Sequence, residues 1–415
     1  MSTKGQGVLS GATWLMVAYV VKLGLGFLSF IWLTRILGPD SFGAVAGLWA
    51  FVTLISPLVD LGAYHLIVDE VTDGVETRTA IGNSALLTAV ALPIGFLLLI
   101  AAKLVVFDEL ALLLVLEAGV AQFVGDRAVT LAVGTHIAHG LIWKNAVIEI
   151  SSAVSRLVSV SILWYLGGGM ETWVHILAIG AVLFGMACIF WVIRVWGLPK
   201  VKVERLPQRL RKGWHYAIGH SARNANNDLD KTMLMEMHSY DVAGIYSAAY
   251  RFIAIAFFPL NAVLGAAHRF FFISGGKGEG GGIVGARRYA FKLLPLTIAY
   301  GVIMTLSLWV LAPYFVMMLG PGYGEVEEAL RWLSILPLII SLSAPFADAL
   351  TGSRLQSVRS KATLITLIIN LVLNSVLIPI LGWKGAVIST VFTQLIFLVY
   401  VFIVSGDRAL KGDYG

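Results

Sequence analysis

Cysteine and charged residues are the two classes that this sequence nearly lacks. Its 415 residues include one cysteine, Cys188, so no disulfide can form within the chain. Charged residues make up 13% of the sequence, against roughly 25% in a soluble protein. Hydrophobic residues make up 58%, and the mean hydropathy is +0.85. These proportions exclude a soluble globular protein and predict an all-α integral membrane protein.

Three kinds of site are also missing. The glycine-rich run 275–282 has no Gly-Lys-Ser/Thr and is therefore no phosphate-binding loop. His136 and His139 stand in a short predicted loop without other ligands, so we expect no metal site and no cofactor. The net charge of +6 does not indicate a nucleic-acid partner, because the basic residues gather in alternate loops, as the positive-inside rule requires.

Repeated apolar stretches of roughly 20 residues predict twelve transmembrane helices. The expected spans are 9–33, 43–67, 82–102, 109–133, 143–166, 173–196, 214–236, 243–268, 289–319, 327–352, 362–382 and 385–404. Lysine and arginine concentrate on the side that holds Lys4 and Lys411, so both termini are predicted to be cytoplasmic. The basic segment 197–212 divides the chain into an N-terminal six-helix bundle (1–196) and a C-terminal six-helix bundle (213–415). We expect this cytoplasmic linker to act as a tether.

The seventh predicted helix is unusually polar for a membrane protein. Within nine residues it holds Arg223, Asn224, Asn226, Asn227, Asp228, Asp230 and Lys231. Four of these side chains follow the spacing i, i+4, i+7 and i+8 and therefore share one helix face: Arg223, Asn227, Asp230 and Lys231. Each charge near the bilayer centre costs several kcal/mol, so this face must meet protein, a partner charge or water. A polar pathway through the middle of the protein is indicated.

The chain also contains an internal repeat. With an offset of 201 residues, Asp40-x-x-Gly43 aligns with Asp241-x-x-Gly244, and Lys22 aligns with Arg223. Because buried cations are rare, we interpret this match as a duplication. An even number of helices in each half makes both repeats enter the membrane in the same sense. A pseudo-twofold axis along the membrane normal is therefore expected to relate the two bundles.

Four motifs carry a resemblance to a known family. They are Thr34-Arg-Ile-Leu-Gly-Pro-Asp-Ser-Phe-Gly43, Val59-Asp-Leu-Gly62, Gly244-Ile-Tyr-Ser-Ala-Ala-Tyr-Arg251 and Leu319-Gly-Pro-Gly-Tyr323. In this order they resemble the polysaccharide transporter family, the Wzx-type flippase branch of the multidrug/oligosaccharidyl-lipid/polysaccharide (MOP) exporter superfamily. The related peptidoglycan-precursor flippases resemble this chain in carrying a cation in helix 1, as Lys22 does here. This chain departs from them in lacking an extra C-terminal pair of helices.

The resemblance implies a MOP/MATE-like fold around a central cavity. It implies translocation of undecaprenyl-pyrophosphate-linked oligosaccharide, a repeat unit of O-antigen or another surface polysaccharide, from the cytoplasmic to the periplasmic leaflet. The protein would be a monomer in the bacterial inner membrane, with membrane lipids and other surface-polysaccharide assembly proteins as partners. No enzymatic activity is expected.

The candidate site residues are the charged side chains of the predicted spans. The candidates for binding substrate are Lys22, Arg127, Arg156, Arg223, Lys231 and Arg251. Arginine suits this task because its guanidinium binds phosphate groups in a bidentate manner. The candidates for ion coupling or charge pairing are Asp60, Glu149, Asp228 and Asp230. For each charge, a structural ion pair remains the alternative.

Two other functions compete with the flippase. A cation-coupled multidrug exporter of the same superfamily favours an acidic or aromatic cavity, whereas this chain places matched cations at Lys22 and Arg223. A membrane polysaccharide polymerase or ligase needs catalytic residues on the periplasmic side, commonly in a sizeable loop. The predicted outside loops are short, and none gathers an acid–base pair. The sequence favours the flippase.

Overall fold

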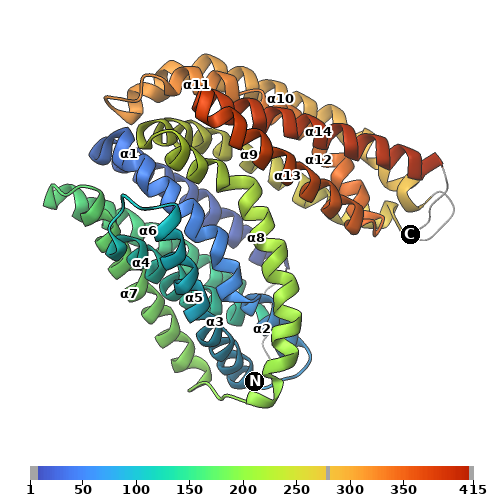
Figure 1. The fold of residues 1–415 in the computed structure, drawn as a ribbon. Helices are drawn as coiled ribbons and strands as arrows, with labels where there is room; N and C mark the ends of the chain where they lie inside the picture. The colour runs from blue at the N-terminus through green and yellow to red at the C-terminus, as the bar shows by residue number, and fades with distance from the viewer. Residues whose placement is uncertain (1–7, 277–280, 411–415) are drawn as a thin grey trace. The chain divides into compact units, whose positions relative to one another are not determined.

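The computed structural model describes residues 8–276 and 281–410 as helices joined by short turns, without a strand in these ranges (Figure 1). Lys4, Lys411 and residues 277–280 of the glycine-rich run lie outside the described residues. The long apolar segments become helices because lipid offers no hydrogen bonds, so each backbone polar group must find its partner within its own segment. The predicted all-α membrane fold is confirmed.

Contacts between residues divide the chain into two compact units. Unit 1 holds residues up to Leu37 and Val45–Leu229, and unit 2 holds Gly38–Ala44 and Asp230–Gly415. Unit 1 contains most of α1 (Val8–Asp60), α2 (Ala63–Thr72), α3 (Thr77–Val105), α4 (Leu112–Val120), the π-helical turn η1 (Ala121–Gly125), α5 (Asp126–Ala138), α6 (Ile142–Leu166), α7 (Met170–Trp196), the short 3-10 turn η2 (Val203–Arg205) and most of α8 (Leu206–Met237). The chain enters unit 2 inside α8, at Asp230, whereas the sequence places the division between the two bundles at the segment 197–212.

Nine helices in the described ranges are long and apolar enough to cross a membrane. Three features explain the difference from the predicted twelve. The 53 residues of α1 extend over roughly 80 Å if straight, enough for two crossings. The span predicted at 109–133 is divided into α4, η1 and α5, and α8 is too polar to qualify. The count of twelve stays a prediction.

Two breaks in the first hundred residues have local causes. Gly38 has φ 70° and ψ 173° inside α1. The following Pro39 disfavours helical geometry at this position, and glycine adopts a positive φ without steric cost. This break is the turn expected between the first two spans. Leu61 and Gly62 also have positive φ, and they end α1 within the predicted span 43–67.

The two repeated Asp-x-x-Gly motifs contact each other within unit 2. A Cβ atom on Gly43 would lie 1.7 Å from the carbonyl oxygen of Tyr240, and one on Gly244 would lie 2.0 Å from that of Pro39. Under the 201-residue offset, Pro39 corresponds to Tyr240, so the contact is reciprocal, as it is between twofold-related copies. This reciprocity supports the interpretation of the repeat as a duplication.

Segment 197–212 is bound to unit 1. The guanidinium of Arg78 on α3 donates to the carbonyl oxygen of Leu198 at 2.8 Å. The backbone N–H of Lys200 donates to the carbonyl oxygen of Arg78 at 2.9 Å. The ammonium of Lys200 also lies 2.9 Å from the carboxylate of Glu76, and this hydrogen bond lowers the pKa of Glu76. The first part of the segment therefore lies against the beginning of α3.

The last part of the same segment is the beginning of α8. Arg209 in this helix is 2% exposed, and its guanidinium lies 2.8 Å from the carboxylate of Glu70 on α2. It also donates to the hydroxyl of Ser84 on α3. Arg209 thus joins three helices of unit 1, and the role of the segment 197–212 as a tether stays a prediction.

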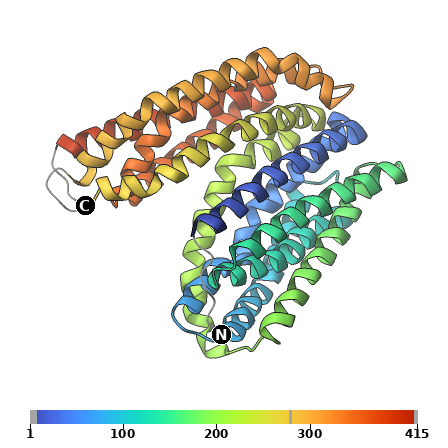
Figure 2. The same cartoon turned by 180° about the vertical axis from the view of Figure 1, so that it is seen from behind.

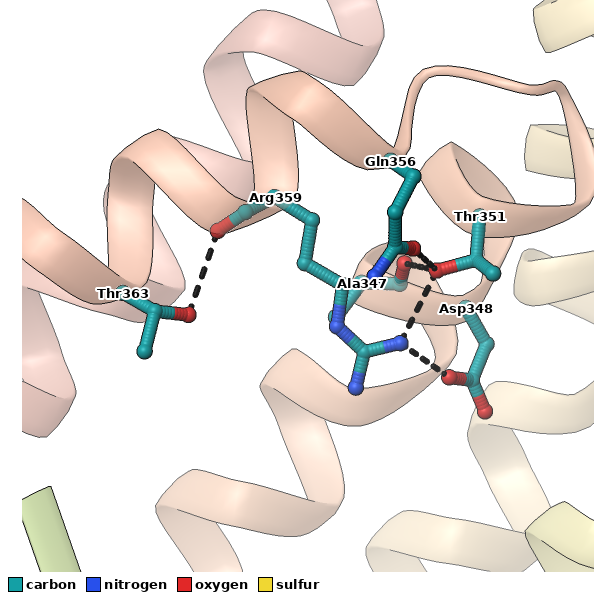
Figure 3. Close-up of polar contacts among 6 residues, drawn as sticks. All are labelled: Ala347, Asp348, Thr351, Gln356, Arg359 and Thr363. Carbon is teal, nitrogen blue, oxygen red and sulfur yellow. Dashed lines mark hydrogen bonds and ion pairs between the residues drawn. The ribbon is translucent and has the colours of Figure 1, made fainter. Parts of the chain in front are cut away.

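Unit 2 is a bundle of long helices that lie side by side in both views (Figures 1 and 2). It is made of α9 (Tyr240–Ser274), α10 (Gly282–Leu319), α11 (Val326–Leu333), α12 (Leu336–Gly352), α13 (Gln356–Leu381) and α14 (Trp383–Leu410). Arg359 holds the turn between α12 and α13 by bonding to Asp348 at 2.8 Å and to Thr351 at 2.9 Å (Figure 3). This end of the bundle contains the predicted cytoplasmic loop 353–361.

Replacing Gly244 with alanine tests the reciprocal glycine contact. The added methyl group would meet the backbone at Pro39, and such overpacking costs about 1–3 kcal/mol. We expect a lower midpoint of thermal unfolding in lipid nanodiscs. Gly265→Ala, in the same helix with nothing within 4 Å of the added Cβ, is the matched control. Equal midpoints for the two variants would contradict the close contact.

Arg209→Met tests the junction between α2, α3 and α8. It leaves the carboxylate of Glu70 without this partner in a site where Arg209 is almost fully buried, and breaking a buried pair costs about 3–5 kcal/mol. We expect a strong loss of folded protein in detergent, measured by size-exclusion chromatography. Arg211→Met, an exposed position two residues further along α8, should leave the elution profile unchanged.

Candidate functional site

The beginning of α8 crosses the break between α1 and α2 at very short range. A Cβ atom on Gly213 would lie 2.2 Å from the carbonyl oxygen of Leu61, and one on Gly62 would lie 2.8 Å from the Cβ of Tyr216. Two features therefore require glycine at position 62 of the Val59-Asp-Leu-Gly62 motif. Its φ is positive, and the close approach of Tyr216 leaves no room for a side chain. This crossing brings polar residues of α8 against the ends of α1 and α2.

A cavity of about 440 Å³ lies at this crossing, within unit 1. Small-molecule sites in proteins have volumes of about 300–1,000 Å³, so the cavity is of the size that takes a ligand. Its walls come from α1, α2, η1, α5 and α8. The lining residues are Thr53, Ser56, Pro57, Asp60, Gly62, Tyr64, His65, Gln122, Arg127, Thr130, Tyr216, Ala217, His220 and Asn224. We call this cavity the unit 1 pocket.

The Asp60–Arg127 ion pair forms part of the pocket wall. The guanidinium of Arg127 on α5 lies 3.1 Å from the carboxylate of Asp60 at the end of α1, and each side chain is 15% exposed. The sequence placed both among the candidates and left open whether Arg127 binds substrate or pairs. The structure shows that it pairs with Asp60, which compensates a charge that would be costly alone inside the membrane.

A second ion pair joins α1 to α6. The ammonium of Lys22 lies 2.5 Å from the carboxylate of Glu149, and the Lys22 side chain is 47% exposed. Asp126 at the start of α5 lies within electrostatic range of Lys22, Arg127 and Arg156. Acids and cations therefore alternate across this part of unit 1.

Two of the predicted substrate-binding cations have no such partner. Arg156 on α6 and Arg223 on α8 are exposed, and neither forms an ion pair or a hydrogen bond with any residue that the structure describes. Arg223 lies one helical turn beyond His220, which lines the unit 1 pocket, and directly before Asn224, which also lines it. The structure thus places one uncompensated guanidinium beside the pocket.

Rings of histidine and tyrosine form the other side of the unit 1 pocket. The ring of His65 stacks on that of Tyr216, with centroids 4.8 Å apart and an angle of 12° between the planes. His220 lies 5.6 Å from His65, and Tyr64 meets His65 edge-on at 5.0 Å. These residues were not among the candidates predicted from the sequence. Histidines within otherwise apolar predicted helices were the available signal.

Two further candidates, Asp230 and Lys231, lie at the unit 2 end of α8. Asp230 at the unit 2 end of α8 is 7% exposed and accepts a hydrogen bond from the hydroxyl of Tyr246 at 2.5 Å. The hydroxyl of Thr390 lies 3.5 Å from that of Tyr246, which extends the group to α14. The ammonium of Lys231 lies 4.6 Å from the ring centre of Tyr250, within cation–π distance.

The last two candidates are Asp228 and Arg251. Asp228 is half-buried on the unit 1 part of α8, and Arg251 is exposed on α9 in unit 2. Within the described ranges, no group of three or more histidine, cysteine, aspartate or glutamate side chains is arranged to hold a metal ion.

The comparisons with known proteins agree with the membrane fold. Solved structures of similar fold include the lipid II flippase MurJ in an inward closed conformation, with a TM-score of 0.73, 14% identity, and coverage of 94% of this chain and 87% of that one. An inward-facing multidrug resistance MATE family transporter has a TM-score of 0.69, 14% identity, and coverage of 95% and 96%. A MOP superfamily transporter from Pyrococcus furiosus, described as having a binding pocket of reverse polarity, has a TM-score of 0.67, 13% identity, and coverage of 99% and 98%.

This chain is therefore a multi-pass membrane protein with the fold of the MOP superfamily transporters. It belongs to the polysaccharide biosynthesis protein family, whose sequence profile matches residues 8–268. No curated protein matches the sequence. The resemblance stated from the four motifs is confirmed.

Arg127→Met tests the ion pair in the pocket wall. The change leaves the carboxylate of Asp60 in a mostly buried place without a compensating charge, and we expect a loss of about 3 kcal/mol in the free energy of unfolding. Asp60→Leu combined with Arg127→Met removes both charges and should recover most of the loss. Arg194→Met, at an exposed position of α7, is the control in chemical unfolding. An unchanged single variant would contradict a structural role for the pair.

Proposed function

We propose that the protein is a flippase that moves undecaprenyl-pyrophosphate-linked oligosaccharide from the cytoplasmic to the periplasmic leaflet of the bacterial inner membrane. Membership of the polysaccharide biosynthesis protein family supports a saccharide substrate. The fold supports transport across the membrane. The observation that carries the proposal is the exposed guanidinium of Arg223 beside the unit 1 pocket, without an ion pair in the described part of the chain.

Pyrophosphate binding follows from the chemistry of these cations. A guanidinium binds phosphate oxygens through two parallel hydrogen bonds, and these bonds strengthen where water is scarce. Arg223 and Arg156 can make such bonds without first giving up an ion pair in the described residues. Lys22 is held by Glu149, so an anionic headgroup must compete with that carboxylate. We assign the primary contact to Arg223 and supporting roles to Arg156 and Lys22.

The proposed direction of transport follows from the position of the pocket. His65 lies on α2, which leads into the predicted cytoplasmic loop 68–80, and Tyr216 follows the segment 197–212 along α8. The positive-inside pattern assigns both loops to the cytoplasmic side. A headgroup made in the cytoplasm would therefore enter unit 1 near the pocket.

The charge pattern disfavours the multidrug exporter. An organic cation needs an uncompensated acid or an open aromatic cage, whereas Asp60, the acid of the pocket lining, contacts Arg127, and Glu149 on α6 contacts Lys22. A polymerase or ligase needs a nucleophile or an acid–base pair at a reacting bond, and the proposed transport requires neither.

Asp230 is the proposed coupling residue. Its carboxylate is buried against Tyr246, a setting in which protonation or binding of a small cation changes the local charge balance strongly. We propose that this group links transport to an ion gradient, and that the two halves alternate in exposing the substrate to each side.

The test is export of surface polysaccharide in cells that lack the chromosomal copy of the gene. Arg223→Ala should reduce export at least about tenfold, because a charged hydrogen bond to phosphate contributes about 1.5–3 kcal/mol. Lys22→Ala should also lose export, whereas Lys22→Arg should retain it, since charge matters more there than shape. Arg211→Ala is the control for a basic residue of α8 outside the pocket. Wild-type export by Arg223→Ala, at equal protein level, would refute the assignment.

A further inference from the structure

The unit 1 pocket is lined by polar groups but carries no net charge when its histidines are neutral. Its only lysine or arginine is Arg127, and Asp60, its only acid, lies 3.1 Å away. A doubly charged phosphate group would find no spare cation inside this lining. Arg223, which has no ion pair within the described ranges, stands between the lining residues His220 and Asn224 on α8 but does not itself line the pocket. An anionic group would therefore bind at Arg223, and the pocket itself would bind an uncharged group.

Many hydrogen-bonding atoms of the lining have no partner among the described residues. The ring nitrogens of His65 and His220 and the hydroxyl of Tyr216 make no hydrogen bond there. Nε of Arg127 is buried without a partner. Asn224 uses its amide N–H on the carbonyl oxygen of Thr53 at 2.8 Å, which leaves its side-chain oxygen as an acceptor. Polar atoms in such a place require a ligand or water.

The stacked rings add a flat apolar surface to these polar atoms. His65 and Tyr216 lie nearly parallel, and His220 extends the ring cluster on α8. A pyranose ring has the complementary shape, with C–H groups on its faces and hydroxyls around its edge. The C–H groups pack on the negative face of an aromatic ring, while the hydroxyls both donate and accept hydrogen bonds. An acyl chain would leave the polar atoms of the lining unsatisfied.

We propose that the unit 1 pocket is a carbohydrate subsite that holds the sugar nearest the pyrophosphate. This inference rests on the proposed function, because a lipid-linked oligosaccharide joins its first sugar directly to the pyrophosphate. Arg223 holds the pyrophosphate beside the pocket, and the first sugar lies among His65, Tyr216, His220 and Asn224. The Asp60–Arg127 pair faces the sugar hydroxyls, where a carboxylate accepts and a guanidinium donates. The pocket thus selects substrates by their glycan, whereas Arg223 binds the part that all such lipids share.

Two separate ligands test the two kinds of binding. The first is the free oligosaccharide, released from the lipid-linked pool of the producing cells by mild acid, which has the glycan and no pyrophosphate. The second is undecaprenyl pyrophosphate, which has the anion and no glycan. The full-length protein in lipid nanodiscs avoids sugar-headed detergents that would compete. Calorimetry or thermophoresis then gives a Kd for each ligand.

Three variants assign the contacts. Tyr216→Leu should weaken oligosaccharide binding about tenfold, because it removes both the ring face and the hydroxyl, and should leave binding of undecaprenyl pyrophosphate unchanged. Tyr216→Phe removes only the hydroxyl and should weaken oligosaccharide binding about threefold, which keeps the test valid if the leucine variant does not fold. Trp214→Leu removes another aromatic ring of α8, 53% exposed and outside the pocket, and should change neither Kd.

Arg223→Ala provides the reverse comparison. It should weaken binding of undecaprenyl pyrophosphate and leave oligosaccharide binding unchanged. If the wild-type protein binds undecaprenyl pyrophosphate but not the oligosaccharide, the carbohydrate subsite is refuted and the flippase proposal stands. If it binds the oligosaccharide alone, the flippase proposal fails and the subsite stands. Equal oligosaccharide binding by the wild-type protein and both Tyr216 variants also refutes the subsite.

Discussion

Compensation of charge inside the membrane is the constraint on which the interior of unit 1 depends. An uncompensated charge in a membrane-spanning helix costs several kcal/mol, so a chain can keep one there only by pairing it or by exposing it to water. Lys22 with Glu149 and Arg127 with Asp60 satisfy the first condition. Each pair joins two helices far apart in sequence, so the same bonds that neutralise the charges also fix how α1, α5 and α6 pack.

Helix α8 serves both units because its composition differs from that of the other long helices. It begins in unit 1, where Gly213 lets it approach the break at Leu61 and Gly62. It ends in unit 2, where Asp230 is buried against Tyr246. A helix with this many polar groups is not stable against lipid, so protein or water must surround it. Its polarity therefore indicates that protein or water, and not lipid, surrounds its polar residues.

The functional proposals rest on one feature of unit 1: the pocket holds hydrogen-bonding groups without net charge, and Arg223, a cation without an ion pair among the described residues, lies beside it. Around the unit 1 pocket, the paired charges leave many donors and acceptors but no surplus cation. The surplus cation, Arg223, stands on α8 between the lining residues His220 and Asn224 without lining the pocket itself. A substrate that carries a neutral glycan beside a charged linkage matches this sequence of environments. Neither an organic cation nor a purely anionic lipid uses both parts.

The sequence by itself determined the membrane fold, most helix positions, the repeat of Asp-x-x-Gly and which charged side chains lie within the predicted spans. These follow from hydropathy and from residue spacing, which are local properties of the chain. It could not determine that Arg127 pairs with Asp60, because the two are 67 positions apart and only packing brings α5 to the end of α1. It also gave no sign that Arg209 is buried or that His65 stacks on Tyr216. The stacking of His65 on Tyr216 accompanies the close crossing of α8 over Gly62, which tertiary structure alone decided. Many crossings satisfy the same hydrophobic pattern, and the one that forms places Gly62 and Gly213 where the two segments meet.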